Sequence, residues 1–92
     1  MKEIVVVTLR APGFSGDFEL PGTVPLRDLY PRLLSVLKKI HSSIFVPYRG
    51  IILETDGRGL LNKQATLFDY GICDGYSLDI VREEKYDGFQ QR

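Results

Sequence analysis

Residues 23–40, TVPLRDLYPRLLSVLKKI, are the only stretch of this sequence with a sustained helical period. Apolar side chains recur there at intervals of three and four residues, which places them on one side of a helix. They are Leu26, Leu29, Tyr30, Leu33, Leu37 and Ile40. Because one amphipathic helix cannot bury its own apolar stripe, other parts of the chain must cover it. The strand-like segments on either side therefore predict a sheet beneath this helix.

The position of Pro31 leaves two ways to start the helix. A helix that begins near Val24 contains Pro31, which removes a backbone hydrogen bond and kinks the helix. If residues 24–29 form only a short turn, Pro31 is the first residue of the main helix, where its missing donor costs nothing. We favour the second arrangement. We also expect Thr23 to cap the helical segment by accepting a backbone N–H bond.

The segment before the helix has the pattern of a β-hairpin. Residues 4–10 are β-branched and apolar on both faces of the pleat, which suits a central strand. One face would carry Ile4 and Val6, and the other Val5, Val7 and Leu9. Residues 17–20 alternate polar and apolar side chains, with Phe18 and Leu20 directed inward. The glycines and proline between the two segments predict a connecting turn.

The segment after the helix contains the remaining predicted elements. Residues 45–48 pass through Pro47 and are expected to be a connector. They are followed by a strand at 49–55, a short edge strand at 60–61, a loop with a helical turn at 62–72 and a last strand at 76–82. A hairpin, a crossing helix and a last strand that returns beside the first give a mixed sheet with one covered face. This is the β-grasp arrangement, an α+β architecture.

Size and composition limit the classes of protein. The 92 residues predict one domain over residues 1–83, followed by a polar tail at 84–92 that we expect to be frayed. Twelve basic residues balance twelve acidic ones, which disfavours nucleic-acid binding. No apolar run approaches the roughly 20 residues that span a bilayer, so no membrane insertion is expected. A single cysteine is consistent with the reducing cytoplasm.

No set of residues has the spacing of an active site. Cys73 and His41 are the only conceivable nucleophile–base pair, and we expect Cys73 to be a small apolar filler and His41 a helix-terminal residue. One histidine and one cysteine far apart in sequence do not make a metal site. Residues 57–59, GRG, lack the rest of a phosphate-binding loop and are interpreted as a turn. We therefore expect no catalytic residue, cofactor or metal.

Several motifs resemble those of known proteins. TLFDYGI at 66–72 and SLDIV at 77–81 resemble the signature of ubiquitin before and through its last strand. LPGTVPLRDLYP at 20–31 and YGICDGYSL at 70–78 are similar to the ubiquitin-like proteins of bacterial type VII secretion. These are the small cytosolic YukD/EsaB family and the ubiquitin-like domain of the membrane component EccD. The resemblance covers nearly the whole chain, and the YukD/EsaB type fits better because no transmembrane region follows.

The resemblance implies a non-enzymatic adaptor of the secretion system. Such a protein would be cytoplasmic, peripheral to the inner face of the membrane, and would bind a membrane or ATPase component through the exposed face of its sheet. Homodimerisation through this face is also plausible. Strand parity and the resemblance together suggest which apolar side chains would face outward: Phe14 at the hairpin tip, Ile52 and Val81, with Val5, Val7 or Leu9. The competing interpretation is that both faces of the first strand are buried.

A ubiquitin-like covalent modifier or carrier is the alternative function. Conjugation requires a C-terminal pair of glycines whose carboxylate can be activated. Residues 86–92, YDGFQQR, contain a lone glycine. We therefore expect the protein to act without being conjugated.

Overall fold

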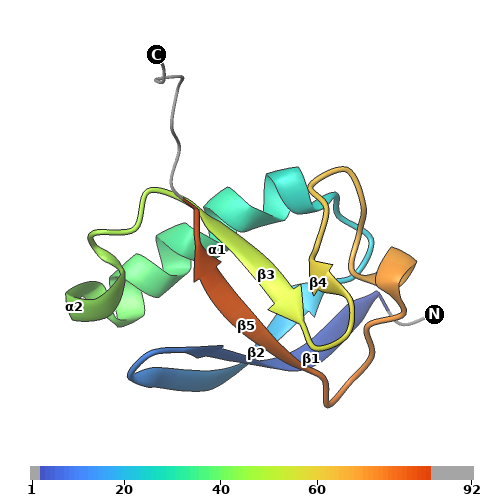
Figure 1. Ribbon diagram of the computed structural model, residues 1–92, viewed down its shortest axis with the longest axis horizontal. Coiled ribbons are helices and arrows are strands. Elements are labelled where there is room, and N and C mark those ends of the chain that lie inside the picture. The colour runs from blue at the N-terminus through green and yellow to red at the C-terminus, as the bar shows by residue number, and fades with distance from the viewer. Residues whose placement is uncertain (1–2, 84–92) are drawn as a thin grey trace.

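The computed structural model describes residues 3–83 (Figure 1). In chain order its elements are β1 (Ile4–Ala11), β2 (Phe14–Pro21), α1 (Leu26–Ile40), α2 (Ser42–Phe45), β3 (Ile51–Thr55), β4 (Gly59–Leu60), the 3-10 turn η1 (Phe68–Tyr70) and β5 (Ser77–Arg82). The five strands form one sheet in the order β2-β1-β5-β3-β4. β5 runs parallel to β1, and every other pair is antiparallel. The predicted β-grasp arrangement is confirmed. The predicted tail at 84–92 lies outside the described residues.

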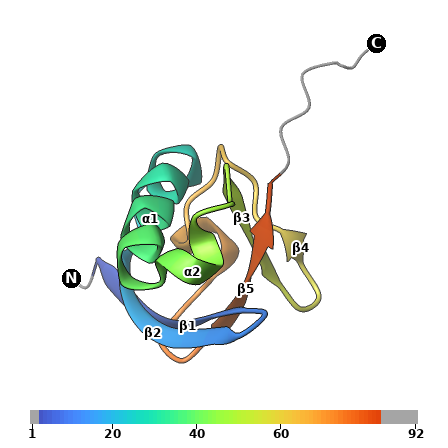
Figure 2. The same ribbon diagram turned by 90° about the vertical axis from the view of Figure 1, so that its left-hand side faces the viewer.

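Both helices lie on one side of the sheet, so the sheet has a covered inner face and an uncovered outer face (Figure 2). The inner face and α1 enclose the core. Five of the six predicted stripe residues of α1 are buried: Leu26, Leu29, Tyr30, Leu33 and Leu37. The prediction that Ile40 is buried is wrong, because 51% of its surface is exposed. It is the last residue of α1, and at that end of the core the space is filled by Phe45 of α2, which is fully buried.

The start of α1 differs from the arrangement favoured from the sequence. The helix begins at Leu26 and contains Pro31, whose ring lies on the exposed side. Its first backbone donors find partners outside the helix, because Leu26 N–H donates to the Ala65 carbonyl (2.9 Å) and Arg27 N–H to the Lys63 carbonyl (3.0 Å). These bonds satisfy orphan N–H groups that a side-chain cap would otherwise have to serve. Thr23 is accordingly not the cap, and Pro25 occupies the N-cap position.

The segment between α1 and β3 was only partly predicted. Residues 42–45 form the short helix α2 where the sequence indicated a break followed by a connector. Phe45 packs edge-on against Phe14 and Tyr48, with ring centroids 5.3 and 5.1 Å away. Edge-to-face pairs of this kind add stabilisation beyond the area that they bury. This aromatic cluster ties the tip of the β1–β2 hairpin to the helical layer.

Gly22 marks a close approach between the end of β2 and η1. Gly22 is buried, and Phe68 N–H donates to its carbonyl oxygen (3.0 Å). A Cβ at this position would overlap the ring of Phe68. We expect Gly22→Ala to lower the free energy of unfolding by about 1–2 kcal/mol, the cost of modest overpacking.

A double-mutant cycle in urea tests whether the ring is responsible. In a Phe68→Ala background, Gly22→Ala should cost less than about 0.5 kcal/mol, because the obstructing ring is gone. An equal cost in both backgrounds would show that the close approach is not the reason for glycine at this position.

Candidate protein-docking face

The placement of β1 corrects the expectation for three candidate residues. Val5, Val7 and Leu9 are almost completely buried, with exposed fractions of 2%, 1% and 0%. In the hairpin Val5 lies opposite Leu20 and Val7 opposite Phe18, on the inner face beneath α1. Their expected outward position is therefore wrong. The competing interpretation, in which both faces of β1 are buried, is also wrong.

The outer face of β1 instead carries Ile4 and Val6, which are 45% and 37% exposed. Sequence reasoning placed them on the other side of the pleat from Val7 but did not identify that side as outward. The signal that could have done so was the inward direction of Phe18 and Leu20, combined with the pairing register of the hairpin. Ile4 lies opposite Pro21 at the end of the hairpin that is remote from its tip.

Ile52 and Val81 lie on the outer face near one end of β3 and β5, as the second residue of β3 and the second-last residue of β5. They are paired across β3 and β5, and both side chains are partly exposed. The next pair on the same face of these strands is Glu54 and Asp79. Asp79 also forms an ion pair with Arg10 on β1 (3.0 Å). The structure thus joins two of the predicted candidates into one apolar pair with charged neighbours.

Phe14 lies at the hairpin tip, as expected, but on the other side of the sheet. It pairs with Ala11 in the last register position of the hairpin. Its ring contacts the helical layer, 4.9 Å from the ring of His41 and 5.3 Å from that of Phe45. The prediction that Phe14 belongs to an outer docking face is therefore wrong. Its ring packs inward against the aromatic surface that α2 supplies.

The structure does not bring Cys73 and His41 together. The turn that contains Cys73 is attached to β1 at Val6, where the Asp74 carboxylate accepts from Val6 N–H (2.8 Å) and Gly75 N–H donates to the Val6 carbonyl (2.9 Å). His41 lies against Phe14, at the opposite end of β1. Cys73 is exposed, so its expected role as an apolar filler is wrong.

Carboxylates of the described residues have structural partners at several turns. Asp69 accepts from Thr66 N–H (2.9 Å), and Asp69 N–H donates back to the Thr66 hydroxyl (3.1 Å), which is a capping-box pattern. Asp17 accepts from the hydroxyl of Thr8 across the hairpin (2.7 Å). Within residues 3–83 no group of histidine, cysteine and carboxylate side chains could hold a metal ion. The described part of the chain has no helix long and apolar enough to cross a membrane.

The chain matches one protein family over most of its length. Residues 4–80 match the family described as the WXG100 protein secretion system (Wss), protein YukD. No curated protein sequence matches the chain significantly.

Solved structures share the fold. The ubiquitin-like domain of the Mycobacterium tuberculosis type VII secretion system protein ECCD1 superposes with a TM-score of 0.72 at 22% identity, over 85% of this chain and 97% of that one. The EccD5 ubiquitin-like domain from Mycobacterium xenopi gives a TM-score of 0.76 at 19% identity, over 91% and 99%. A protomer of the ESX-3 core complex gives 0.62 at 26% identity, and here 97% of this chain corresponds to only 18% of that one.

Proposed function

The chain belongs to the YukD family of the WXG100 protein secretion system, and we propose that it acts there as a non-enzymatic adaptor. It would dock on a membrane or ATPase component of the secretion machine through the outer face of its sheet. The observation that carries this proposal is the pair Ile52 and Val81, two partly exposed apolar side chains on a face that neither helix covers.

The chemistry of this face suits a specific, non-covalent contact. Apolar side chains that a partner can desolvate supply most of the affinity in protein interfaces, whereas surrounding charges select the partner. Here Glu54, Asp79 and Arg10 lie on one side of the apolar pair. A partner for this face would combine a small apolar projection with groups that complement two carboxylates and a guanidinium.

The proposed location follows from the proposed partners. Ubiquitin-like domains of this fold occur in EccD proteins, and chains of ESX inner membrane complexes contain a similar unit. A small domain that binds such a complex would lie in the cytoplasm, at the inner face of the membrane. It would be held there by a protein partner rather than by direct insertion.

Affinity capture from native cells tests the proposal. Tagged protein is recovered with detergent-solubilised membranes, and the eluate is separated on a denaturing gel and identified by mass spectrometry. We expect secretion ATPase or membrane subunits, with the tagged protein at its own intact mass. An untagged strain is the control.

Two results would contradict the adaptor proposal. A denaturation-resistant ladder containing the tagged protein would show covalent attachment and favour the modifier alternative. Recovery of a second copy of the chain alone, without secretion subunits, would instead assign the outer face to a homodimer.

A further inference from the structure

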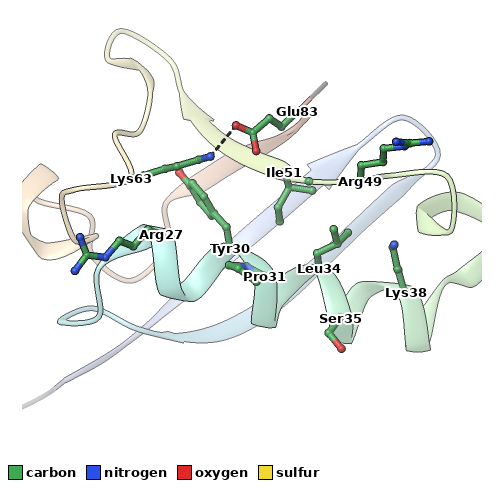
Figure 3. A pocket seen from close by; sticks show the side chains of 11 residues that line it. Arg27, Tyr30, Pro31, Leu34, Ser35, Lys38, Arg49, Ile51, Lys63 and Glu83 are labelled. Carbon is green, nitrogen blue, oxygen red and sulfur yellow. Dashed lines mark hydrogen bonds and ion pairs between the residues drawn. The ribbon is translucent and has the colours of Figure 1, made fainter. Parts of the chain in front are cut away.

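A groove of about 510 Å³ lies between α1 and the start of β3 (Figure 3). Its floor is apolar, because Leu34 of α1 and Ile51 of β3 meet there and are 8% and 1% exposed. The Pro31 ring extends this apolar surface along α1. We call this hollow the basic groove, after the residues that surround the floor.

Basic side chains outnumber acidic ones among the described residues that line the basic groove. Arg27, Lys38, Arg49 and Lys63 line it, and within residues 3–83 Glu83 is the only acidic residue that does. Glu83 already has a partner, because its carboxylate forms an ion pair with Lys63 (2.8 Å) at one end of the groove. An excess of positive charge therefore remains in a domain whose overall formal charge is zero.

Two of the cations lack a compensating partner within residues 3–83. Lys38 and Arg49 form no ion pair or side-chain hydrogen bond there, whereas Arg27 donates to the amide oxygen of Gln64 (3.2 Å). Figure 3 shows Lys38 extending from α1 toward the segment that carries Arg49. The two cations thus flank the end of the groove opposite the Lys63–Glu83 ion pair.

We propose that the basic groove binds an acidic segment of a partner protein. An apolar side chain of that segment would pack on Leu34 and Ile51, and a neighbouring carboxylate would lie between Lys38 and Arg49. A guanidinium and an ammonium beside an apolar floor favour a carboxylate close to an apolar group.

The same features argue against a nucleic acid as occupant. Nucleic-acid binding draws its affinity from many phosphate contacts along an extended basic surface. In the part of the chain that the structure describes, the groove offers two uncompensated cations, and its apolar floor gives nothing to a phosphate backbone. A protein segment uses both the charge and the floor.

This inference does not rest on the proposed role of the outer sheet face. α1 covers the inner face of the sheet, and the groove opens along the edge of α1, whereas Ile52 and Val81 point to the other side. One domain could therefore hold a secretion component on its sheet and an acidic segment in its groove at the same time.

The test uses a synthetic peptide of defined composition and the whole protein labelled with nitrogen-15. The probe is an amphipathic peptide in which leucines alternate with pairs of glutamates, and a matched peptide has glutamine for every glutamate. We expect the acidic peptide to shift the amide resonances of Leu34, Ser35, Gly50 and Ile51. Higher salt should weaken this binding, because its electrostatic part is screened.

Charge-reversal variants identify the cations responsible. The double variant Lys38→Glu/Arg49→Glu should weaken binding of the acidic peptide by about tenfold or more. The matched control is Arg32→Glu/Lys39→Glu, which reverses two exposed cations of α1 that do not line the groove. If the first double variant fails to fold, Lys38→Gln/Arg49→Gln serves in its place and should weaken binding in the same direction.

Several results would overturn the inference. These are equal binding of the glutamine peptide, equal losses in the two charge-reversal variants, or shifts confined to the outer sheet face. Tighter binding of a single-stranded oligonucleotide or of phosphatidylserine vesicles in the same groove would assign it to another class of ligand. Ile52→Asp should leave peptide binding unchanged, so failure of the docking proposal and failure of this one are distinguishable.

Discussion

Val7→Asp is expected to leave the domain unfolded without denaturant, whereas Val6→Asp, one residue earlier on β1, is expected to leave it folded. Val7 is 1% exposed and lies opposite Phe18 beneath α1, where a carboxylate would have no partner. Burying an unpaired charge costs several kcal/mol, which is comparable with the whole stability of a small domain, about 5–10 kcal/mol. Circular dichroism and urea titration of both variants measure the difference.

Val6→Asp is the matched control because it makes the same chemical change on the outer face. The Val6 side chain is 37% exposed, and the backbone bonds of this residue to Asp74 and Gly75 do not involve it. We expect a cost below about 1 kcal/mol, as for most surface substitutions. Similar costs for the two variants would contradict the assignment of the inner and outer faces of β1.

Tyr30→Phe is expected to lower the free energy of unfolding by about 2–4 kcal/mol, although it removes a single oxygen. The Tyr30 hydroxyl donates to the Leu61 carbonyl (2.9 Å) and accepts from Leu53 N–H (3.2 Å), and all three groups are buried. Without the hydroxyl, a backbone donor of β3 and a backbone acceptor of the following loop remain buried and unpaired. Urea unfolding of both proteins at neutral pH measures the loss.

The pH dependence of stability provides a second test of Tyr30. Burial raises the pKa of its phenol from 10.0 to about 12. Above pH 10 the unfolded chain releases this proton while the folded chain keeps it, so stability is fully present below pH 10 and is lost as the pH rises toward 12. Two pKa units correspond to about 2.7 kcal/mol.

The Tyr30→Phe variant should lack this part of the loss of stability at alkaline pH. The other tyrosines are present in both proteins, so the difference between their stabilities isolates Tyr30. We expect the difference in the free energy of unfolding between wild type and variant to become smaller from pH 9 to pH 12. A constant gap would contradict a buried, proton-retaining phenol at this position.

The helical stripe and the strand pattern were sufficient to predict the fold class. Leu26, Leu29, Leu33 and Leu37 recur with a period that only a helix satisfies, and they are buried as the pattern requires. The start of the same helix was not predictable in this way. It depends on the carbonyls of Lys63 and Ala65, which accept bonds from the first turn of α1 although they lie far along the chain.

The faces of the first strand could not be assigned from its own residues. Ile4, Val6, Val5 and Val7 are all β-branched, so hydrophobicity does not tell one side from the other. The hairpin register decides, because a shift of one residue exchanges the two faces. The long pairing between β1 and β2, which ends at Ala11 opposite Phe14, places Val7 rather than Val6 on the core side.

The outward direction of a candidate docking residue could be predicted only where strand parity separates it from a strongly buried neighbour. In β3 and β5, Ile52 and Val81 face outward, as expected from parity, because the alternate residues Leu53 and Ile80 are strongly buried. Phe14 illustrates the opposite case. Its direction depends on α2, a four-residue helix too short to leave a periodic pattern in the sequence.

Quantitative capture by sheet-face variants is the most direct test of the proposed docking. Secretion subunits recovered from native membranes are compared for wild type, Ile52→Asp and Val81→Asp, after thermal unfolding confirms that each variant is folded. The control is Val36→Asp, which places the same charge on an exposed valine of α1. We expect recovery to fall by about tenfold or more for the two sheet variants and to stay near wild type for the control, since a few desolvated apolar contacts carry most of the affinity of an interface. Unchanged recovery with both folded sheet variants would show that the partner binds elsewhere.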